Sequence, residues 1–255
     1  MTGEFSESWL ALREPADAAA RAADLIDLIP GPVRTIRDLG CGTGSLGRWL
    51  APRLPTPQHW VMADRDPALL DFARANMPFE GVTVETSLSD VTALTAADLA
   101  GTDLVTCSAL LDLLTSDEVT ALVAACAESA TPALFTLSVA GEVRFDPARP
   151  DDAEVAAAFD EHQRRTDGGR RLLGPDAPAF AAAAFEKTGA LVVTRPSPWH
   201  LGPEVAGLTA EWLRGWVGAA AEQRSDQRFD DYLAERLGNL PTAVVGHVDL
   251  LATFG

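Results

Sequence analysis

The chain has 255 residues, 47% of them hydrophobic, and its 37 acidic and 20 basic side chains give a net charge of −17. These values are typical of one α/β domain with a full core, and the negative field disfavours nucleic acid or an anionic membrane as a partner. No apolar run approaches the roughly 18–20 residues of a membrane span, and residues 1–9 contain no basic residue, unlike a secretory signal, so we expect a cytoplasmic protein.

The first 30 residues are predicted to be helical, over 6–12 and 15–29, with Pro15 in the first turn of the second helix. Strands and helices then alternate. The expected strands are 35–39, 59–63, 82–86, 103–107 and 133–139. The expected helices between them are 46–54, 67–76 and 116–129, with a short helical or loop stretch at 94–100. This alternation predicts a mostly parallel, doubly wound α/β sheet.

Beyond Gly141 the alternation breaks. Helices are expected at 151–166 and 176–188, followed by a strand at 191–194. Two more helices, about 204–221 and 226–237, precede a final strand at 243–252. We therefore expect a single domain, 1–255, with N-terminal helices over 1–30 and two insertions, about 142–174 and 199–240, that cap the carboxyl edge of the sheet.

A glycine-rich segment, Gly40-Cys41-Gly42-Thr43-Gly44, follows the first strand directly. Glycines let the backbone approach a ligand closely, and free N–H groups at the start of the next helix attract a carboxylate or phosphate. Ligands of doubly wound sheets bind at the carboxyl ends of strands. The segment therefore predicts a site for the charged tail of a ligand.

Acidic residues stand at three strand ends. Asp64, after the second strand, suits the two hydroxyls of a ribose, and Asp90, after the third, suits an adenine amine. Asp38 closes the first strand, where it suits a ligand that bears an ammonium group. Together the three strand ends describe an adenosine nucleoside with a charged tail.

A nicotinamide cofactor fits less well, and an oxidoreductase is the weaker hypothesis. Residues 42–47 read Gly-x-Gly-x-x-Gly, but the first glycine after the strand is Gly40, and counting from it places Ser45 at the third glycine position. A Tyr-x-x-x-Lys pair and a Gly-Lys-Ser/Thr phosphate loop are both absent from the sequence.

Four segments in order resemble the motifs of class I S-adenosylmethionine-dependent methyltransferases: residues 38–44, 63–67, 89–91 and 103–111. The resemblance implies this cofactor, with S-adenosylhomocysteine as its product, and a seven-stranded, Rossmann-like sheet whose last strand, 243–252, inserts antiparallel. It also implies residue roles. The methionine part lies at Asp38 and the loop residues Gly40, Cys41, Gly42 and Gly44, the ribose at Asp64, the adenine faces at Arg65 and Val91, the adenine amine at Asp90, and the reactive methyl over Ser108.

The acceptor is less well specified, because methyl transfer requires positioning more than a nucleophilic side chain. We expect a small molecule, methylated on oxygen or nitrogen in a capped pocket. His162, Asp112 and His200 are candidate bases or acceptor contacts; packing or helix capping is the alternative for each. Arg13 is a candidate partner of the cofactor carboxylate or of an acidic acceptor, with an ordinary salt bridge as the alternative.

Two other functions remain open at this point: a methyltransferase acting on protein or RNA, and a non-catalytic module that binds the same cofactor. The sequence lacks an Asn/Asp-Pro-Pro-Tyr/Phe segment after the fourth strand, which disfavours methylation of base or glutamine amino groups. Its three cysteines form no Cys-x-x-Cys pair, so we expect no metal site. Both a monomer and a homodimer are compatible with the sequence.

Overall fold

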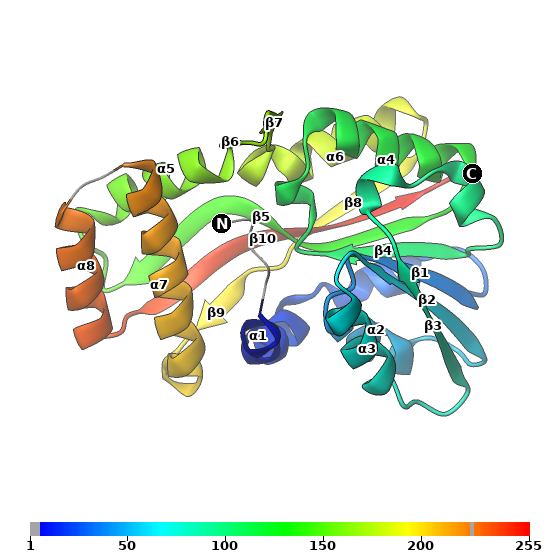
Figure 1. The fold of residues 1–255 in the computed structure, drawn as a ribbon, viewed down its shortest axis with the longest axis horizontal. Coiled ribbons are helices and arrows are strands. Elements are labelled where there is room, and N and C mark those ends of the chain that lie inside the picture. The colour runs from blue at the N-terminus through cyan, green and yellow to red at the C-terminus, as the bar shows by residue number, and fades with distance from the viewer. Residues whose placement is uncertain (1–5, 225–226) are drawn as a thin grey trace.

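The computed structural model describes residues 6–224 and 227–255, and a mixed sheet forms its centre (Figure 1). Within these residues the sheet has eight strands in the order β3-β2-β1-β4-β5-β10-β8, with β9 paired to β10. The strands are β1 Thr35–Leu39, β2 Gln58–Asp64, β3 Val82–Leu88, β4 Leu104–Ser108, β5 Ala133–Asp146, β8 Leu191–Pro196, β9 Trp199–Leu201 and β10 Thr242–Thr253. A separate hairpin pairs β6 Thr166–Asp167 with β7 Arg170–Arg171.

The sheet has the predicted topology. Strands β1 to β5 pair in parallel, and β10 pairs antiparallel with both β5 and β8. The central strand β4 is buried on both faces along residues 104–107, as expected for a parallel strand covered by helices on both sides. The prediction of a doubly wound sheet with an inserted antiparallel last strand is thus confirmed; the short strand β9 was not predicted.

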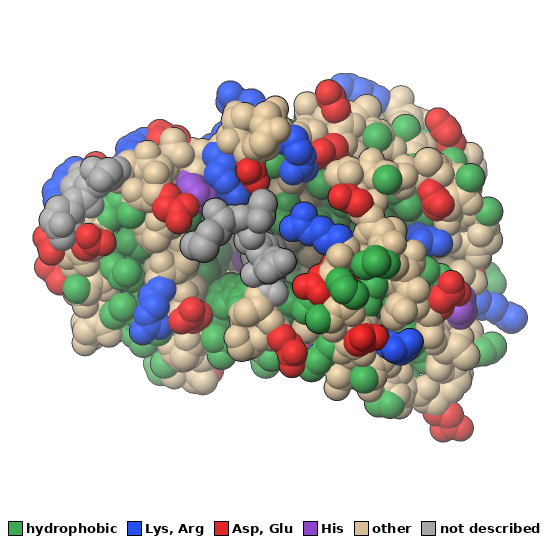
Figure 2. Space-filling view, viewed as in Figure 1, with side chains coloured by type: hydrophobic (Ala, Val, Ile, Leu, Met, Phe, Trp, Pro, Cys, Tyr) green, Lys and Arg blue, Asp and Glu red, His purple; other side chains and the backbone are tan. Residues whose placement is uncertain are grey.

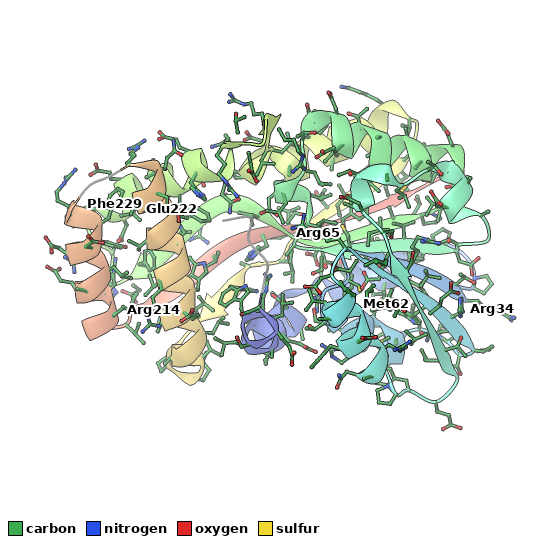
Figure 3. The ribbon with its side chains drawn as sticks, in the orientation of Figure 1. Arg34, Met62, Arg65, Arg214, Glu222 and Phe229 are labelled. Atoms are coloured by element: carbon green, nitrogen blue, oxygen red, sulfur yellow. The ribbon has the colours of Figure 1, made fainter. Side chains whose placement is uncertain are left out.

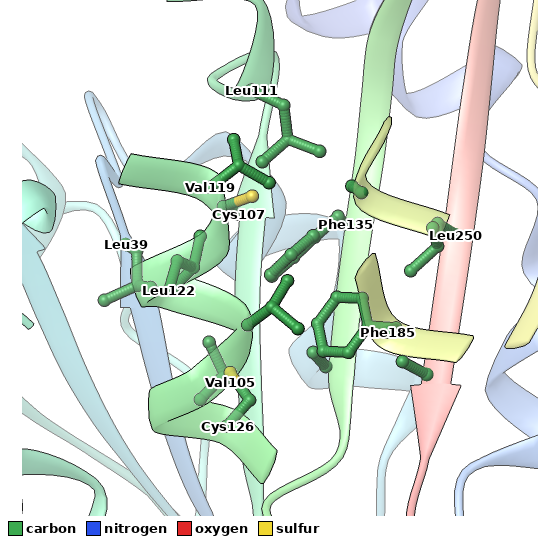
Figure 4. Close-up of a cluster of buried hydrophobic side chains, with 14 of the residues drawn as sticks. Leu39, Val105, Cys107, Leu111, Val119, Leu122, Cys126, Phe135, Phe185 and Leu250 are labelled. Carbon is green, nitrogen blue, oxygen red and sulfur yellow. The ribbon is translucent and has the colours of Figure 1, made fainter. Parts of the chain in front are cut away.

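Helices cover both faces of the sheet. On one face lie α4 Ser116–Glu128 and α6 Ala177–Lys187, and on the other α2 Ser45–Leu50 and α3 Pro67–Ala75 (Figure 1). Short 3₁₀ turns connect the elements: η1 Ala23–Leu28, η2 Ala51–Arg53, η3 Val91–Ala93, η4 Ala96–Leu99, η5 Leu111–Leu113, η6 Gly174–Asp176 and η7 Pro203–Val205. Figure 4 shows the core under α4 and α6, where the rings of Phe135 and Phe185 lie 5.7 Å apart.

The N-terminal region differs from the expectation of two α-helices. One helix, α1 Glu7–Ala20, runs through Pro15, and residues beyond it form the 3₁₀ turn η1. Proline removes one backbone hydrogen bond from a helix interior. Contacts on both sides of it hold the helix together: Arg13 binds Asp17, one turn later, and Arg48 of α2 binds Glu14. Contacts with the rest of the fold therefore keep the helix continuous through Pro15, where the sequence predicted a break between two helices.

Apart from the β6–β7 hairpin, the two late segments extend the sheet instead of capping its edge. Helices α5 Asp152–Gln163, α7 Ala206–Gln223 and α8 Gln227–Gly238 pack around the projecting ends of β5 and β10, beside the main layers (Figure 1). Their shared core is aromatic: Phe145 contacts Trp212 and Trp216 at ring distances of 5.9 and 5.5 Å. Among the described residues, no helix is both long enough and apolar enough to cross a membrane.

Candidate functional site

A pocket of about 510 Å³ opens at the carboxyl ends of β1, β2 and β4, bounded by α1 and the β6–β7 hairpin. It gathers most of the predicted site residues in one place: Arg13, Asp38, Gly40, Cys41, Gly42, Asp64, Arg65, Asp90, Val91 and Ser108. Figure 3 shows Arg65 in the middle of the molecule and Arg34 at its far edge. A second hollow, beside Arg34 and His59, contains none of the predicted residues.

The glycine loop is shaped by contacts with the neighbouring strand end. The Cys41 N–H donates to the Ala63 carbonyl at 3.0 Å, and the Gly42 N–H donates to Asp64 Oδ2 at 2.8 Å. Gly40 has a φ of +58°, and a Cβ atom there would lie 3.1 Å from Leu110 Cδ2, so this position requires glycine. Gly44 begins α2 in the left-handed conformation but does not line the pocket. Burial raises the pKa of the Cys41 thiol, so the group stays protonated.

Asp38 ends β1 as a buried carboxyl, only 1% exposed. Its Oδ1 accepts a hydrogen bond from Thr106 Oγ1 at 2.8 Å, whereas Oδ2 has no partner among the described residues. Burial raises its pKa to about 7, although Thr106 and the Arg21 charge act in the opposite direction. A buried acceptor without a donor is costly unless a ligand supplies one.

Arg21 is a buried cation beside this carboxyl that the sequence reasoning missed. Its Nη2 contacts Ser45 Oγ at 3.3 Å and Ser108 Oγ at 3.2 Å, and both serines line the pocket. Its Nε and Nη1 have no partner, and it makes no salt bridge within the described part of the chain. Burial lowers its pKa. A sequence signal was present, because Arg21 interrupts the apolar face formed by Ala18, Ala22 and Leu25.

The two other strand-end acids also line the pocket, with some of their acceptor capacity already used. Asp64 accepts from the Gly42 N–H and from the Asp66 N–H, the latter at 3.0 Å on Oδ1. Asp90 Oδ1 accepts from the N–H and the hydroxyl of Thr92, at 2.9 and 2.8 Å. Each carboxylate oxygen has two lone-pair sites, so Asp64 and Asp90 both retain free acceptor positions toward the pocket.

Residues 36–133 match the family model for a methyltransferase domain. The matched stretch contains the glycine loop and all three acidic strand ends. This stretch of the chain is a class I S-adenosylmethionine-dependent methyltransferase domain.

Solved structures share the fold of this methyltransferase. A cyclopropane-fatty-acyl-phospholipid synthase-like protein from Lactobacillus casei is 16% identical, with a TM-score of 0.58 over 99% of this chain and 94% of that chain. The cyclopropane synthase MmaA2 from Mycobacterium tuberculosis is 16% identical, with a TM-score of 0.55 over 98% and 95% of the two chains. No curated protein sequence matches the chain. At these identities the likeness to solved structures establishes the fold of the methyltransferase.

The pocket of the methyltransferase has a second half, away from the glycine loop. Its walls come from α1, from the loop after β4 and from the hairpin, and they contribute leucine and arginine side chains. Arg13 lies here, with its guanidinium paired to Asp17 at 2.9 and 3.2 Å. Asp17 also accepts from the Trp199 indole at 3.0 Å. Arg13 thus lines the pocket, as predicted from the sequence, but its guanidinium is already paired with the Asp17 carboxylate.

The candidate bases do not line this pocket. His162, on α5, lies 3.2 Å from Glu222 of α7, because the aromatic core turns this face of α5 toward α7. His200 is exposed on β9. Asp112, in η5, is buried below the pocket and its Oδ1 has no partner among the described residues. Burial raises the pKa of Asp112 to about 6, against the opposing charges of Arg13 and Arg165.

Proposed function

We propose that the methyltransferase binds S-adenosylmethionine with its amino-acid end between Asp38 and Arg21 and transfers the methyl group to oxygen or nitrogen of a small molecule. The acceptor occupies the second half of the same pocket. The whole chain acts as one domain in this proposal, with α1 and the β6–β7 hairpin enclosing the acceptor.

The observation that carries this proposal is a pair of incompletely partnered buried charges. Asp38 lines the pocket with a carboxylate oxygen that has no partner among the described residues. Arg21 is bonded to the pocket-lining Ser45 and Ser108, and its Nε and Nη1 likewise have no partner among those residues. The methionine end of the cofactor is a zwitterion, with an ammonium and a carboxylate on one carbon. The ammonium satisfies Asp38 and the carboxylate satisfies Arg21, so one ligand removes two costs of burial.

The nucleoside end fits the next two strand ends. Free lone pairs of Asp64 accept from the ribose hydroxyls. Arg65 and Val91 line the pocket between Asp64 and Asp90, where the adenine ring would lie. Asp90 retains an oxygen for the adenine amine. The order along the sheet edge, β4-β1-β2-β3, matches the order of these groups along the cofactor.

The chain's contribution to transfer is positioning and exclusion of water. The sulfonium of the cofactor is itself a good leaving group, and neither His162 nor Asp112 lines the pocket, so we assign a base role to neither. A small acceptor is favoured over protein or RNA because the second half of the pocket is bounded by α1 and the hairpin. The net charge of −17 also opposes an RNA substrate.

Binding of S-adenosylhomocysteine and of 5′-methylthioadenosine, which lacks the amino-acid end, tests these assignments by calorimetry. Asp64→Ala is expected to weaken binding of both ligands by about 1–3 kcal/mol, the cost of lost hydrogen bonds to a charged group. Arg21→Gln is expected to weaken only S-adenosylhomocysteine. Asp71→Ala, at an exposed acid on α3 outside the pocket, is the matched control.

Loss of both ligands in Arg21→Gln would indicate misfolding, which a thermal melt of the same variant reveals. Equal binding of both ligands by Arg21→Gln and by the native chain would contradict the assigned orientation. Failure of the native chain to bind S-adenosylhomocysteine would refute the proposed function.

A further inference from the structure

The second half of the pocket holds three arginines, although the chain as a whole is strongly acidic. Arg13, Arg165 and Arg170 reach it from α1 and from the segment around the β6–β7 hairpin. In Figure 2, several basic side chains lie near the middle of this face. Leucine side chains form the apolar part of the wall: Leu10, Leu110, Leu113, Leu114 and Leu172. Three acids, Asp17, Glu118 and Asp167, also line the pocket.

Two of the three guanidiniums are neutralised inside the protein. Arg13 binds Asp17 through two nitrogens. Arg170 binds Glu118 through Nε and Nη2, at 2.8 and 2.6 Å, and also contacts the Leu113 carbonyl. Asp167, a further acid that lines this half, acts on Arg170 and raises its pKa together with Glu118. These contacts leave Arg13 and Arg170 little capacity for an acidic ligand.

Arg165 is different, because it has no carboxylate partner among the residues that the structure describes. Its Nη1 contacts the His162 carbonyl at 3.2 Å and the His162 ring at 3.5 Å, and its other guanidinium nitrogens make no hydrogen bond to residues 6–224 or 227–255. Arg13 and Arg165 both line the pocket, and the charges of both act on the buried carboxyl of Asp112, where they oppose the rise in its pKa that burial causes. Asp112 does not line the pocket and is not in contact with either of them.

A half-buried guanidinium with free donors is a receptor for a planar anion. Its N–H fork matches the two oxygens of a carboxylate, and such charge-assisted pairs are among the strong hydrogen bonds. The leucine wall around it favours an apolar body on the same molecule.

We propose that the acceptor is an apolar molecule bearing a carboxylate, and that Arg165 binds this carboxylate while the leucines hold the apolar body. This inference rests on the proposed function, since it assigns the acceptor class of the same pocket. Arg165 is a specificity-determining residue in this assignment.

Binding of apolar acids to the complex with S-adenosylhomocysteine tests this assignment. The probes are octanoate, 4-phenylbutanoate and indole-3-acetate, each compared with its primary amide by calorimetry and saturation-transfer NMR. At least one acid is expected to bind about tenfold or more tightly than its amide, as expected for a charged hydrogen-bonded pair. Arg165→Gln is expected to remove this preference and to leave S-adenosylhomocysteine binding unchanged.

Arg171→Gln is the matched control, because Arg171 is exposed on the same hairpin and does not line the pocket. It is expected to keep the preference for the acid, and Arg165→Lys to keep part of it. The assignment is overturned if no acid is preferred over its amide, or if Arg165→Gln retains the preference. Absence of S-adenosylhomocysteine binding in the native chain would instead refute the proposed function, and this inference with it.

Discussion

At the scale of single residues, the proposed binding of the cofactor's amino-acid end depends on Asp38 and Arg21. Asp38 was predictable, because an acid at the end of a strand that precedes a glycine loop has few structural uses. Arg21 was not predicted, because its place beside the site depends on the end of α1 packing against Ser45 and Ser108, which lie 24 and 87 residues later in the sequence. His162 does not line the pocket. Its position on α5 was predicted from the sequence, but the orientation of α5 that places His162 beside Glu222 was not.

Ionisation of Asp38 predicts a pH dependence of cofactor-product binding. The raised pKa, about 7, means that Asp38 is largely protonated below that pH in the free enzyme. Because the ammonium group prefers the ionised carboxylate, S-adenosylhomocysteine affinity is expected to fall up to about tenfold per pH unit below 7 and to level off above it. Calorimetry between pH 5.5 and 8, in the range set by this pKa, measures the slope.

Two controls identify the titrating group. Asp38→Asn is expected to abolish the slope, whereas 5′-methylthioadenosine, without the ammonium, is expected to show none with the native chain. A slope that persists in Asp38→Asn would assign the titration to another group.

Asp112 predicts an effect on stability instead. Its folded-state pKa of about 6 exceeds the ordinary value of 3.8, so its contribution to stability is present below pH 4 and is lost as the pH rises through 6. Asp112→Asn is therefore expected to raise the free energy of unfolding by about 1–3 kcal/mol at pH 8 and by much less at pH 4. Urea unfolding at the two pH values tests this; an equal change at both would show that ionisation is not the cause.

At the scale of elements, Asp249 of β10 joins three segments around the site. It is fully buried and accepts from the Ala22 N–H at 2.8 Å, the Leu137 N–H at 2.7 Å and the Ser197 hydroxyl. Leu137 has a φ of +55° within β5, a conformation that non-glycine residues rarely adopt. Asp249 thereby fixes the residue after Arg21, an irregular point of β5 and the link between β8 and β9.

Removal of this junction predicts a large loss of stability. Asp249→Ala leaves three buried donors without an acceptor, so the free energy of unfolding is expected to fall by about 3–5 kcal/mol. Ser197→Ala removes only one donor and is expected to cost about 1–2 kcal/mol. Denaturant unfolding of both variants measures the two values, and a loss in Asp249→Ala no greater than that in Ser197→Ala would contradict the junction.

The order and type of most elements were predictable, because apolar runs, glycines and prolines mark the parallel strands and their helices locally. The observed bounds of β10, Thr242–Thr253, match the expected strand 243–252 within one residue at each end. The length of β5 was not predictable. It continues to Asp146, well beyond its expected end at residue 139, because its second half pairs with β10 and packs against α5, α7 and α8. The expected cap became an extension of the sheet for this reason, and only the hairpin region reaches the pocket. Strand length and helix placement of this kind depend on contacts between segments that are distant in sequence, such as the pairing of β5 with β10.

At the scale of the whole molecule, buried charged groups at the carboxyl edge of the sheet lack part of their hydrogen-bond partners within the described chain. Asp38 and Arg21 remain partly unpartnered there, so a ligand that pairs with both stabilises the fold as well as the site. At 100 times its dissociation constant, S-adenosylhomocysteine is expected to raise the free energy of unfolding by about 2.7 kcal/mol. Differential scanning calorimetry measures the accompanying rise in Tm, which is expected to increase with ligand concentration; a Tm that does not respond would contradict selective binding to the folded state.

A crystal structure of the complex with S-adenosylhomocysteine tests the central claim most directly. We expect the ammonium of the bound molecule within hydrogen-bond distance of Asp38 Oδ2, its carboxylate at Arg21, and its ribose hydroxyls at Asp64. A ligand bound with its amino-acid end elsewhere, with Asp38 and Arg21 still lacking those partners, would contradict the account.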